Sequence, residues 1–315
     1  MSAFRHLFGP VLSRRLGLSL GVELVPEKTC SYDCVFCQIG RTPCTTLERA
    51  RFVPEDEVLA DFSAWLAGGG KADHITLAGA GEPTLHAGFG DILDGLRARS
   101  AIPTVLMSNG SLFYVPEVRA ASAKADIVKV SLSGWDEASW RQVNRPDSSL
   151  RFDRVLEGIR AFARDYRGTL WVEVFLVRGI NDRPEQVARI AALVNPLKPA
   201  CVHLNTVVRP PAEPEARSVA EDAMRELAAL FHPPAETPVS DRSRSVSAGA
   251  GGGLLETVTR HPSTLAQLVE SLHGDPGSLL KELEALEKAG RVESVMTEGA
   301  VYYRRRRDPV NPSGG

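Results

Sequence analysis

Three cysteines lie within eight residues, at Cys30, Cys34 and Cys37, and an aromatic residue, Phe36, directly precedes the third. Cubane iron–sulfur clusters are held by cysteine thiolates, and a short loop can direct several thiolates at one cluster. Three such ligands leave one iron of a four-iron cube open to a substrate or cofactor. The C-x3-C-x2-C spacing therefore favours a [4Fe–4S] centre with an open iron.

Two other uses of the same thiols stay open at this point. A structural zinc site could add Cys44 as a fourth ligand, although zinc ligands usually come as two separated pairs. A redox disulfide between Cys34 and Cys37 is the second alternative, but it leaves Cys30 unexplained. The iron–sulfur site accounts for more of the pattern than either alternative.

The segments around these cysteines alternate between strand and helix. Residues 18–25 predict a buried strand directly before the cysteines, and residues 4–17 are expected to be an irregular lead-in. Such alternation predicts a parallel sheet with right-handed crossovers, whether open or curved. Five further strands are expected at 74–78, 103–108, 127–132, 169–177 and 201–208, with helices at 54–67, 89–99, 116–124, 152–166, 184–194 and 219–231.

Short or small polar residues follow several of these strands. The second strand ends in Ala78-Gly79-Ala80-Gly81-Glu82, where small residues let the backbone approach a ligand and Glu82 can accept a hydrogen bond from an ammonium group. A glycine-rich turn with a surface glutamate would have the same sequence. Asn109 follows the third strand and Ser131 and Ser133 the fourth; they suit either a site at the strand ends or turns and helix caps.

The C-terminal quarter has a different composition. Residues 233–253 are rich in Pro, Ser, Ala and Gly and predict a flexible linker. Residues 254–307 predict three helices and a hairpin, a pattern that resembles a winged helix, and 308–315 are expected to be a disordered tail. The third helix, 276–289, carries two lysines against three glutamates, which argues against DNA reading. The expected first domain is 1–232.

The cysteine pattern resembles the cluster loop of the radical S-adenosylmethionine (SAM) superfamily. This resemblance implies an α/β fold with a partial (β/α)6 TIM-like barrel, open at one side, with the site at the C-terminal ends of the strands. It also implies two cofactors, a [4Fe–4S] cluster and SAM, whose amino and carboxylate groups chelate the open iron. Reductive cleavage of SAM in that family releases methionine and a 5′-deoxyadenosyl radical, which abstracts hydrogen from an unreactive C–H bond.

The resemblance carries roles onto particular residues of this chain. The glycine-containing segment after the second strand matches the motif that receives the SAM amino group, with alanine in place of its first glycine. The implied metal ligands are Cys30, Cys34 and Cys37, and the implied SAM contacts are Phe36, Ala80, Gly81, Glu82, Asn109, Ser131, Ser133 and Val177.

Longer strings, among them residues 8–42, 80–86 and 204–211, are similar to the subgroup of wyosine-type tRNA-modifying enzymes. That similarity implies an enzyme acting on an unidentified substrate, a tRNA base or a peptide, with a flavodoxin or ferredoxin as reductant. An alternative function follows from the winged-helix-like segment: an iron–sulfur redox sensor that binds nucleic acid or a protein. The alternative is weakened by the acidic third helix.

Bulk properties limit the location and the partners. A formal net charge of −2 over 315 residues provides no global attraction to nucleic acid or to an anionic membrane. Five cysteines, three of them clustered, argue for a reducing compartment rather than a disulfide framework. The N-terminus lacks the apolar core of a signal peptide, and no apolar run approaches the ~20 residues of a membrane span. We therefore expect a cytoplasmic protein without a membrane partner.

Overall fold

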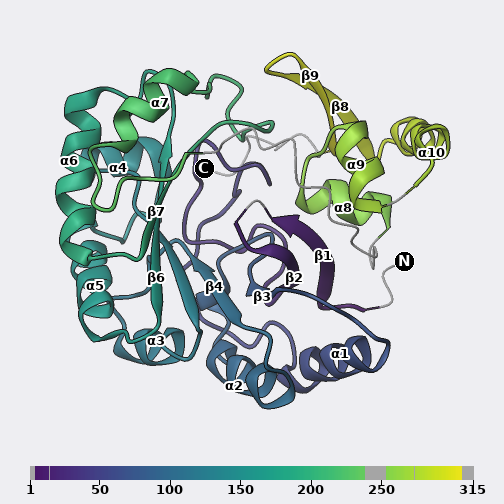
Figure 1. Ribbon diagram of the computed structural model, residues 1–315, viewed down its shortest axis with the longest axis horizontal. Helices are drawn as coiled ribbons and strands as arrows, with labels where there is room; N and C mark the ends of the chain where they lie inside the picture. The colour runs from purple at the N-terminus through teal and green to yellow at the C-terminus, as the bar shows by residue number, and fades with distance from the viewer. Residues whose placement is uncertain (1–3, 14, 238–252, 273, 307–315) are drawn as a thin grey trace.

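One curved sheet forms the body of the protein (Figure 1). The computed structural model describes residues 4–13, 15–237, 253–272 and 274–306. Within them, seven strands pair in sequence order; β2 to β7 are parallel, and β1 is antiparallel to β2. The strands are β1 Leu7–Ser13, β2 Gly17–Val22, β3 His74–Leu77, β4 Thr104–Ser108, β5 Ile127–Ser131, β6 Thr169–Leu176 and β7 Cys201–Thr206.

Helices cover the outer face of this sheet and leave β1 and β7 as its two edges (Figure 1). The six parallel strands with their helices confirm the predicted partial (β/α)6 barrel. Among the described residues, no helix is both long and apolar enough to cross a bilayer. The helices are α1 Glu55–Ala67, α2 Phe89–Arg99, α3 Pro116–Ser122, α4 Glu137–Asn144, α5 Phe152–Asp165, α6 Pro184–Val194 and α7 Glu221–Ala228, with 3₁₀ turns η1 Pro83–Leu85 and η2 Asn195–Leu197.

Strand β6 shows how the two faces of the sheet differ. Its burial alternates residue by residue, as expected for a strand with helices on one side only. On the concave side, the Glu173 carboxylate accepts hydrogen bonds from Lys129 Nζ and Asn205 Nδ2, both at 2.6 Å. Arg15 Nη2 in turn donates to Asn205 Oδ1 at 3.1 Å, so that a polar chain links the β1–β2 turn to β7.

Two elements differ from the sequence prediction. The expected irregular lead-in contains β1, whose pairing with β2 is interrupted between Phe8 and Val11. Gly9 and Pro10 made this strand hard to predict from the sequence. Proline is tolerated there because a residue on an edge strand needs no backbone hydrogen bond on its outer side. Helix α4 is also additional; Asp136 caps it by accepting the N–H of Ser139 at 2.9 Å. Its eight residues are too few for a clear helical period.

Residues 254–305 form a C-terminal unit with its own apolar core, beside β1 in Figure 1. It consists of α8 Leu254–Arg260, α9 Leu265–Leu272, α10 Pro276–Lys288 and a hairpin of β8 Val292–Thr297 and β9 Ala300–Arg305. The winged-helix assignment of this unit stays a prediction. Residues 238–252 of the expected linker and the expected tail at 308–315 lie outside the described residues.

Candidate functional site

The three clustered cysteines occupy a loop, residues 30–37, between β2 and α1. This cysteine loop contacts the loop after β4 and the segment between α4 and α5. Ser31 Oγ lies 2.7 Å from Ser111 Oγ, and Tyr32 forms an isolated β-bridge with Pro146. Asp33, in the cysteine loop, also accepts the backbone N–H of Thr42 at 2.6 Å. The thiols are therefore held at the C-terminal ends of the parallel strands.

Each clustered thiol has a nitrogen donor beside it. N–H···S contacts to cluster ligands are one of the ways in which proteins set the reduction potential of an iron–sulfur centre. Two of the donors are far away in the sequence, one in the loop after β4 and one at the end of α4, and the third is a lysine in the approach to the cysteine loop. The pairs are Asn109 Nδ2 with Cys30 Sγ at 3.7 Å, Asn144 Nδ2 with Cys34 Sγ at 3.3 Å, and Lys28 Nζ with Cys37 Sγ at 3.4 Å.

The electrostatic environment disfavours bare thiolates. Burial raises the pKa of Cys30 to about 12, and the nearby Glu82 carboxylate adds to that rise. Burial, together with the neighbouring Cys37 and Cys30, also raises the pKa of Cys34 well above its usual range. Deprotonated sulfur at this place requires a compensating cation, which the iron of a cluster provides.

Glu82 lies directly after the turn that follows β3 and is 2% exposed. Burial raises the pKa of its carboxyl group, and hydrogen bonds from Asn109, Thr84 and Ser108 offset only part of this rise. Its Oε1 accepts hydrogen bonds from Thr84 N–H at 3.1 Å and from the hydroxyls of Thr84 and Ser108, at 2.6 and 2.8 Å. Its Oε2 accepts the N–H of Asn109 at 2.8 Å. A carboxylate oxygen can accept two hydrogen bonds, so an ammonium group fits beside Oε2.

Gly81, in the turn before Glu82, has no room for a side chain. A Cβ at Gly81 would lie 2.2 Å from the carbonyl oxygen of Thr29, a backbone atom of the segment that leads into the cysteine loop. The backbone of the turn also pairs with that segment, since Glu82 N–H donates to Thr29 O at 2.9 Å and Lys28 N–H donates to Ala80 O at 2.8 Å. The turn and the cysteine loop therefore form one packed structure.

An apolar cluster lies on the other side of the cysteine loop. Phe36 stacks on Phe175 with ring centroids 3.8 Å apart and planes within 6°. Val177, after β6, is fully buried in the same cluster, and Ile180 packs against it. Two residues of the sequence prediction, Phe36 and Val177, therefore belong to one apolar cluster, in which Phe36 is partly buried and Val177 fully buried.

Two predicted contact residues use their side chains within the protein. Asn109 donates from Nδ2 to Ser31 Oγ at 2.9 Å as well as to Cys30, and its Oδ1 accepts the N–H of Ser111. Ser133 is buried, and its hydroxyl accepts the N–H of Phe175 at 2.9 Å. Ser131 is half-buried at the end of β5.

Sequence reasoning missed Lys28 and Asn144 as residues of the site. Neither has a spacing relative to the cysteines that indicates a contact. Position alone could have drawn attention to Lys28, because it lies two residues before Cys30.

Four charged residues form the rim beside the cysteine loop. Arg41 contacts both Asp33 and Glu213 at 2.7 Å, and Arg145 contacts Glu213 at 2.5 Å and Asp33 at 3.7 Å. The two arginines hold the pKa of Glu213 below its usual value. The rim is thus nearly charge-balanced and ties the loops after β2, β5 and β7 together.

Cys201, His203 and Glu236 form a further group, with one ligand atom of each within 4.8 Å of the others. No sequence spacing indicated it, because Glu236 is brought to β7 by an isolated bridge. Burial and the positive charges of Arg15 and Lys129 lower the pKa of His203 to about 3. The same charges disfavour a metal cation here, so the group carries no assignment.

The open parallel barrel and the cysteine loop at its strand ends define a radical SAM protein. A family model described as the Radical SAM superfamily matches residues 24–191, and the chain belongs to that superfamily. The cofactors that this family uses are a [4Fe–4S] cluster and SAM. The donor set described above, three thiols with nitrogen donors beside a buried carboxylate, fits both.

Individual relatives extend the comparison. The chain is 35% identical over 227 residues to a UPF0026 protein of Methanocaldococcus jannaschii, covering 71% of this chain and 70% of that one. It is 31% identical over 307 residues, 95% of this chain, to a protein named GTPase Obg of Brachyspira hyodysenteriae, of which it spans 45%. Among solved structures, a radical SAM methyltransferase from Sphaerobacter thermophilus has the same fold, with a TM-score of 0.51 and 16% identity over 70% of this chain and 66% of that one.

Proposed function

We propose that this protein is a radical SAM enzyme that holds a [4Fe–4S] cluster through Cys30, Cys34 and Cys37. The observation that carries the proposal is the position of these thiols: each meets a nitrogen donor, and Asn109 joins Cys30 to the buried Glu82 carboxylate. When bound there, the cluster supplies the electron that cleaves SAM to methionine and a 5′-deoxyadenosyl radical for C–H abstraction.

Residues around the cysteine loop bind different parts of SAM in this proposal. Glu82 accepts the SAM ammonium group, and the backbone of Ala80 and Gly81 lines the same place. Phe36 and Val177 pack against the adenine ring. The hydroxyl of Ser131 serves the ribose or carboxylate at the end of β5.

Asn109 and Ser133 act less directly in this proposal. Asn109 joins the cysteine loop to Glu82, because its side chain reaches Cys30 and Ser31 while its backbone N–H reaches the Glu82 carboxylate. Ser133 orients the backbone of β6 beside the adenine surface. Substituting either residue should therefore alter SAM binding through its neighbours.

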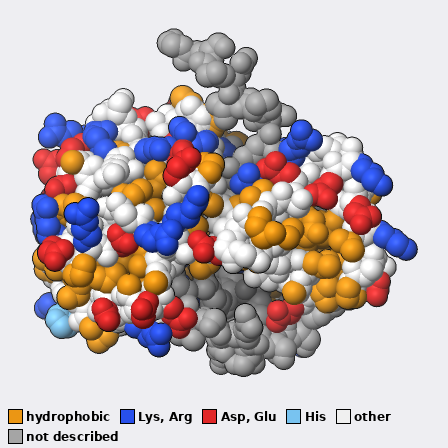
Figure 2. Space-filling view, turned by 90° about the horizontal axis from the view of Figure 1, so that it is seen from above, with side chains coloured by type: hydrophobic (Ala, Val, Ile, Leu, Met, Phe, Trp, Pro, Cys, Tyr) orange, Lys and Arg blue, Asp and Glu red, His pale blue; other side chains and the backbone are white. Residues whose placement is uncertain are grey.

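We further infer that the substrate is a tRNA base or a peptide and that a flavodoxin or ferredoxin delivers the electron in the cytoplasm. The first domain would end near residue 232, with a winged-helix-like domain at 254–307. Figure 2 shows the face of the molecule that is seen from above, where Lys and Arg are mixed with Asp and Glu. Such a mixed distribution argues against this face as a binding surface for duplex DNA.

The test is SAM cleavage by the reconstituted protein. The protein would be loaded anaerobically with iron and sulfide, reduced with dithionite and assayed for 5′-deoxyadenosine. Cys30→Ala, Cys34→Ala and Cys37→Ala should each abolish the product. Cys44→Ser is the matched control, because Cys44 is exposed and its thiol lies 3.7 Å from the carbonyl oxygen of Thr45.

Normal 5′-deoxyadenosine formation by a Cys34→Ala variant would overturn the assignment. Bound zinc in place of a cluster, with no product, would mean that the loop is structural. If cleavage is confirmed, tRNA and peptide pools can be added in turn, since the true substrate should stimulate the consumption of SAM.

A further inference from the structure

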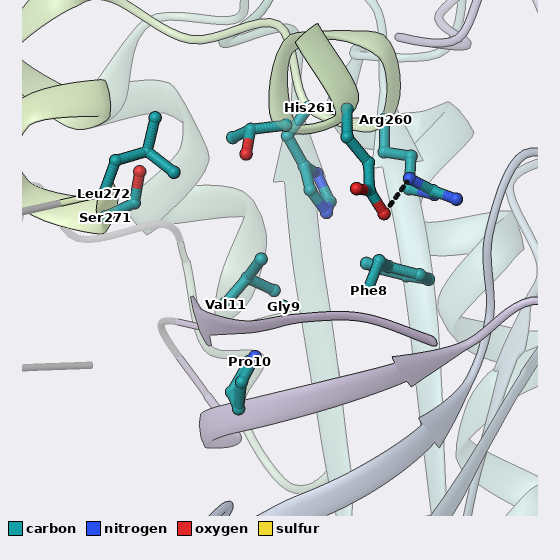
Figure 3. A pocket seen from close by; sticks show the side chains of 10 residues that line it. Phe8, Gly9, Pro10, Val11, Arg260, His261, Ser271 and Leu272 are labelled. Atoms are coloured by element: carbon teal, nitrogen blue, oxygen red, sulfur yellow. Dashed lines mark hydrogen bonds and ion pairs between the residues drawn. The ribbon is translucent and has the colours of Figure 1, made fainter. Parts of the chain in front are cut away.

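Arg260, the last residue of α8, connects the C-terminal unit to the barrel. Its Nε and Nη2 both donate to Glu23 Oε2, at 3.0 and 2.5 Å, and its Nη1 donates to Glu256 at 2.9 Å. Figure 3 shows the guanidinium beside Phe8 of β1, and its central carbon lies 4.9 Å from the centre of that ring. The side chains of Arg260 and Glu23 are only 15% and 19% exposed, so water screens this ion pair weakly.

Glu23 joins this ion pair to the turn before Glu82. Its second oxygen, Oε1, accepts the N–H of Ala80 at 3.0 Å. Gly79 has φ +152, and a Cβ there would lie 2.9 Å from the same oxygen. The glycine turn, defined as residues 79–81, therefore rests directly on the Glu23 carboxylate.

Charge balance explains why Arg260 matters for the turn. Glu23 and Glu256 bring two carboxylates to one largely buried place, and Arg260 is the cation that contacts both. Removing one partner of a buried pair leaves the other charge uncompensated, and that charge then moves toward water. If Glu23 turns outward, the N–H of Ala80 loses its acceptor and the glycine turn loses its support.

Further contacts align the C-terminal unit with the same site. His261, next to Arg260, lies 3.4 Å from the Nε2 of Gln38, the residue directly after Cys37. The hydroxyl of Tyr302 donates to Val208 O after β7 at 2.8 Å. The unit thus contacts segments beside the cysteine loop and beside the last strand, as well as Glu23.

We propose that Arg260 is a positioning residue for SAM, which acts through Glu23 on the glycine turn and so makes SAM affinity depend on docking of the C-terminal unit. This inference rests on the proposed function, because it takes the glycine turn as part of the SAM site. It assigns the C-terminal unit a role in cofactor binding that does not involve nucleic acid.

The test is a double-mutant cycle on SAM binding. Arg260→Ala in the reconstituted full chain should raise the Kd for SAM about tenfold while the iron content stays at the wild-type value. Glu23→Gln keeps an oxygen for Ala80 but carries no charge. In that background, Arg260→Ala should therefore change the Kd little. Arg260→Lys should restore part of the affinity, because it returns the charge without the two-nitrogen fork.

Arg305→Ala is the matched control, since Arg305 of β9 forms a different ion pair with the barrel, to Glu27 at 2.6 Å. Its SAM affinity should remain close to that of the wild type, because the Arg305 and Glu27 side chains are 55% and 42% exposed and the loss of this screened pair weakens docking of the unit little. The Kd is measured by equilibrium dialysis with labelled SAM, and iron content and thermal unfolding report whether each variant is folded.

The outcomes separate this inference from the function on which it rests. Wild-type protein that carries a cluster but binds no SAM would overturn the proposed function, and the positioning role with it. Wild-type protein that binds SAM, with a folded Arg260→Ala variant of equal affinity, would overturn the positioning role alone. If Arg260→Ala lowers SAM affinity equally in the wild-type and Glu23→Gln backgrounds, Arg260 does not act through Glu23. That result would also overturn the positioning role.

Discussion

The ammonium group of Lys28 lies 3.4 Å from the sulfur of Cys37 and 2.6 Å from the carbonyl oxygen of Gly40. Lys28 adopts the left-handed backbone conformation, with φ 63. The lysine therefore spans the cysteine loop and brings a positive charge to one of the proposed cluster ligands. A positive charge at that place stabilises the reduced, more negative state of a cluster.

Removing this charge should make the cluster harder to reduce. We expect Lys28→Met to lower the reduction potential by roughly 60 mV, which is a tenfold change for a one-electron couple. A redox titration followed by EPR spectroscopy measures the shift. Lys71→Met is the control, since Lys71 is exposed on the loop between α1 and β3. An unchanged potential in Lys28→Met would show that the ammonium group does not act on the cluster.

Glu82→Gln should weaken SAM binding more than it weakens the fold. The amide keeps the size of the carboxylate but lacks the charge that attracts the SAM ammonium group, so we expect the Kd for SAM to rise about tenfold or more. Iron content should stay near that of the wild type, because Glu82 is not a proposed ligand. Equilibrium dialysis and iron analysis on one preparation test both expectations. Wild-type affinity in the variant would show that Glu82 does not bind the SAM ammonium group.

Gly81→Ala should disrupt the turn even though it adds a single methyl group. The new Cβ would lie 2.2 Å from the backbone oxygen of Thr29, which cannot rotate away. We expect a loss of about 1–3 kcal/mol in the free energy of unfolding, together with weaker SAM binding. Denaturant unfolding measures the first effect. Gly253→Ala is the control, because a Cβ at Gly253 meets no atom of the described residues within 4 Å.

His203 should make the barrel sensitive to acid. It is 1% exposed, and burial with Arg15 and Lys129 lowers its pKa from 6.5 to about 3; Glu173 opposes this shift, and Glu236 Oε2 lies 3.6 Å from its Nε2. Below pH 6.5 the imidazole of His203 binds a proton in the unfolded chain but stays neutral in the folded barrel until the pH nears 3. The free energy of unfolding should therefore fall with pH from about 6.5 down to about 3, by at most about 1.4 kcal/mol per pH unit.

His203→Gln should flatten this part of the stability profile, because glutamine does not titrate. The measurement is the midpoint of denaturant unfolding between pH 7 and pH 4, in parallel for both proteins. An identical slope for wild type and variant would assign the acid sensitivity to other groups.

The sequence by itself determined the features that depend on local spacing. The cysteine triplet, the small residues before Glu82 and the strand–helix alternation of the barrel could all be predicted, because each is set by residues close together in the chain. Phe36 and Val177 were each predicted to contact SAM; that they share one apolar cluster is seen only in the structure.

Tertiary structure alone decided which distant residues complete the site. Asn144 is 110 positions from the thiol of Cys34 to which it donates, and Arg260 is 237 positions from Glu23. The edge strand β1 likewise forms only because β2 offers it a partner. Periodicity reports which face of an element is apolar. It does not report which loops meet at the end of a barrel, because curvature of the sheet and docking of the C-terminal unit bring those loops together.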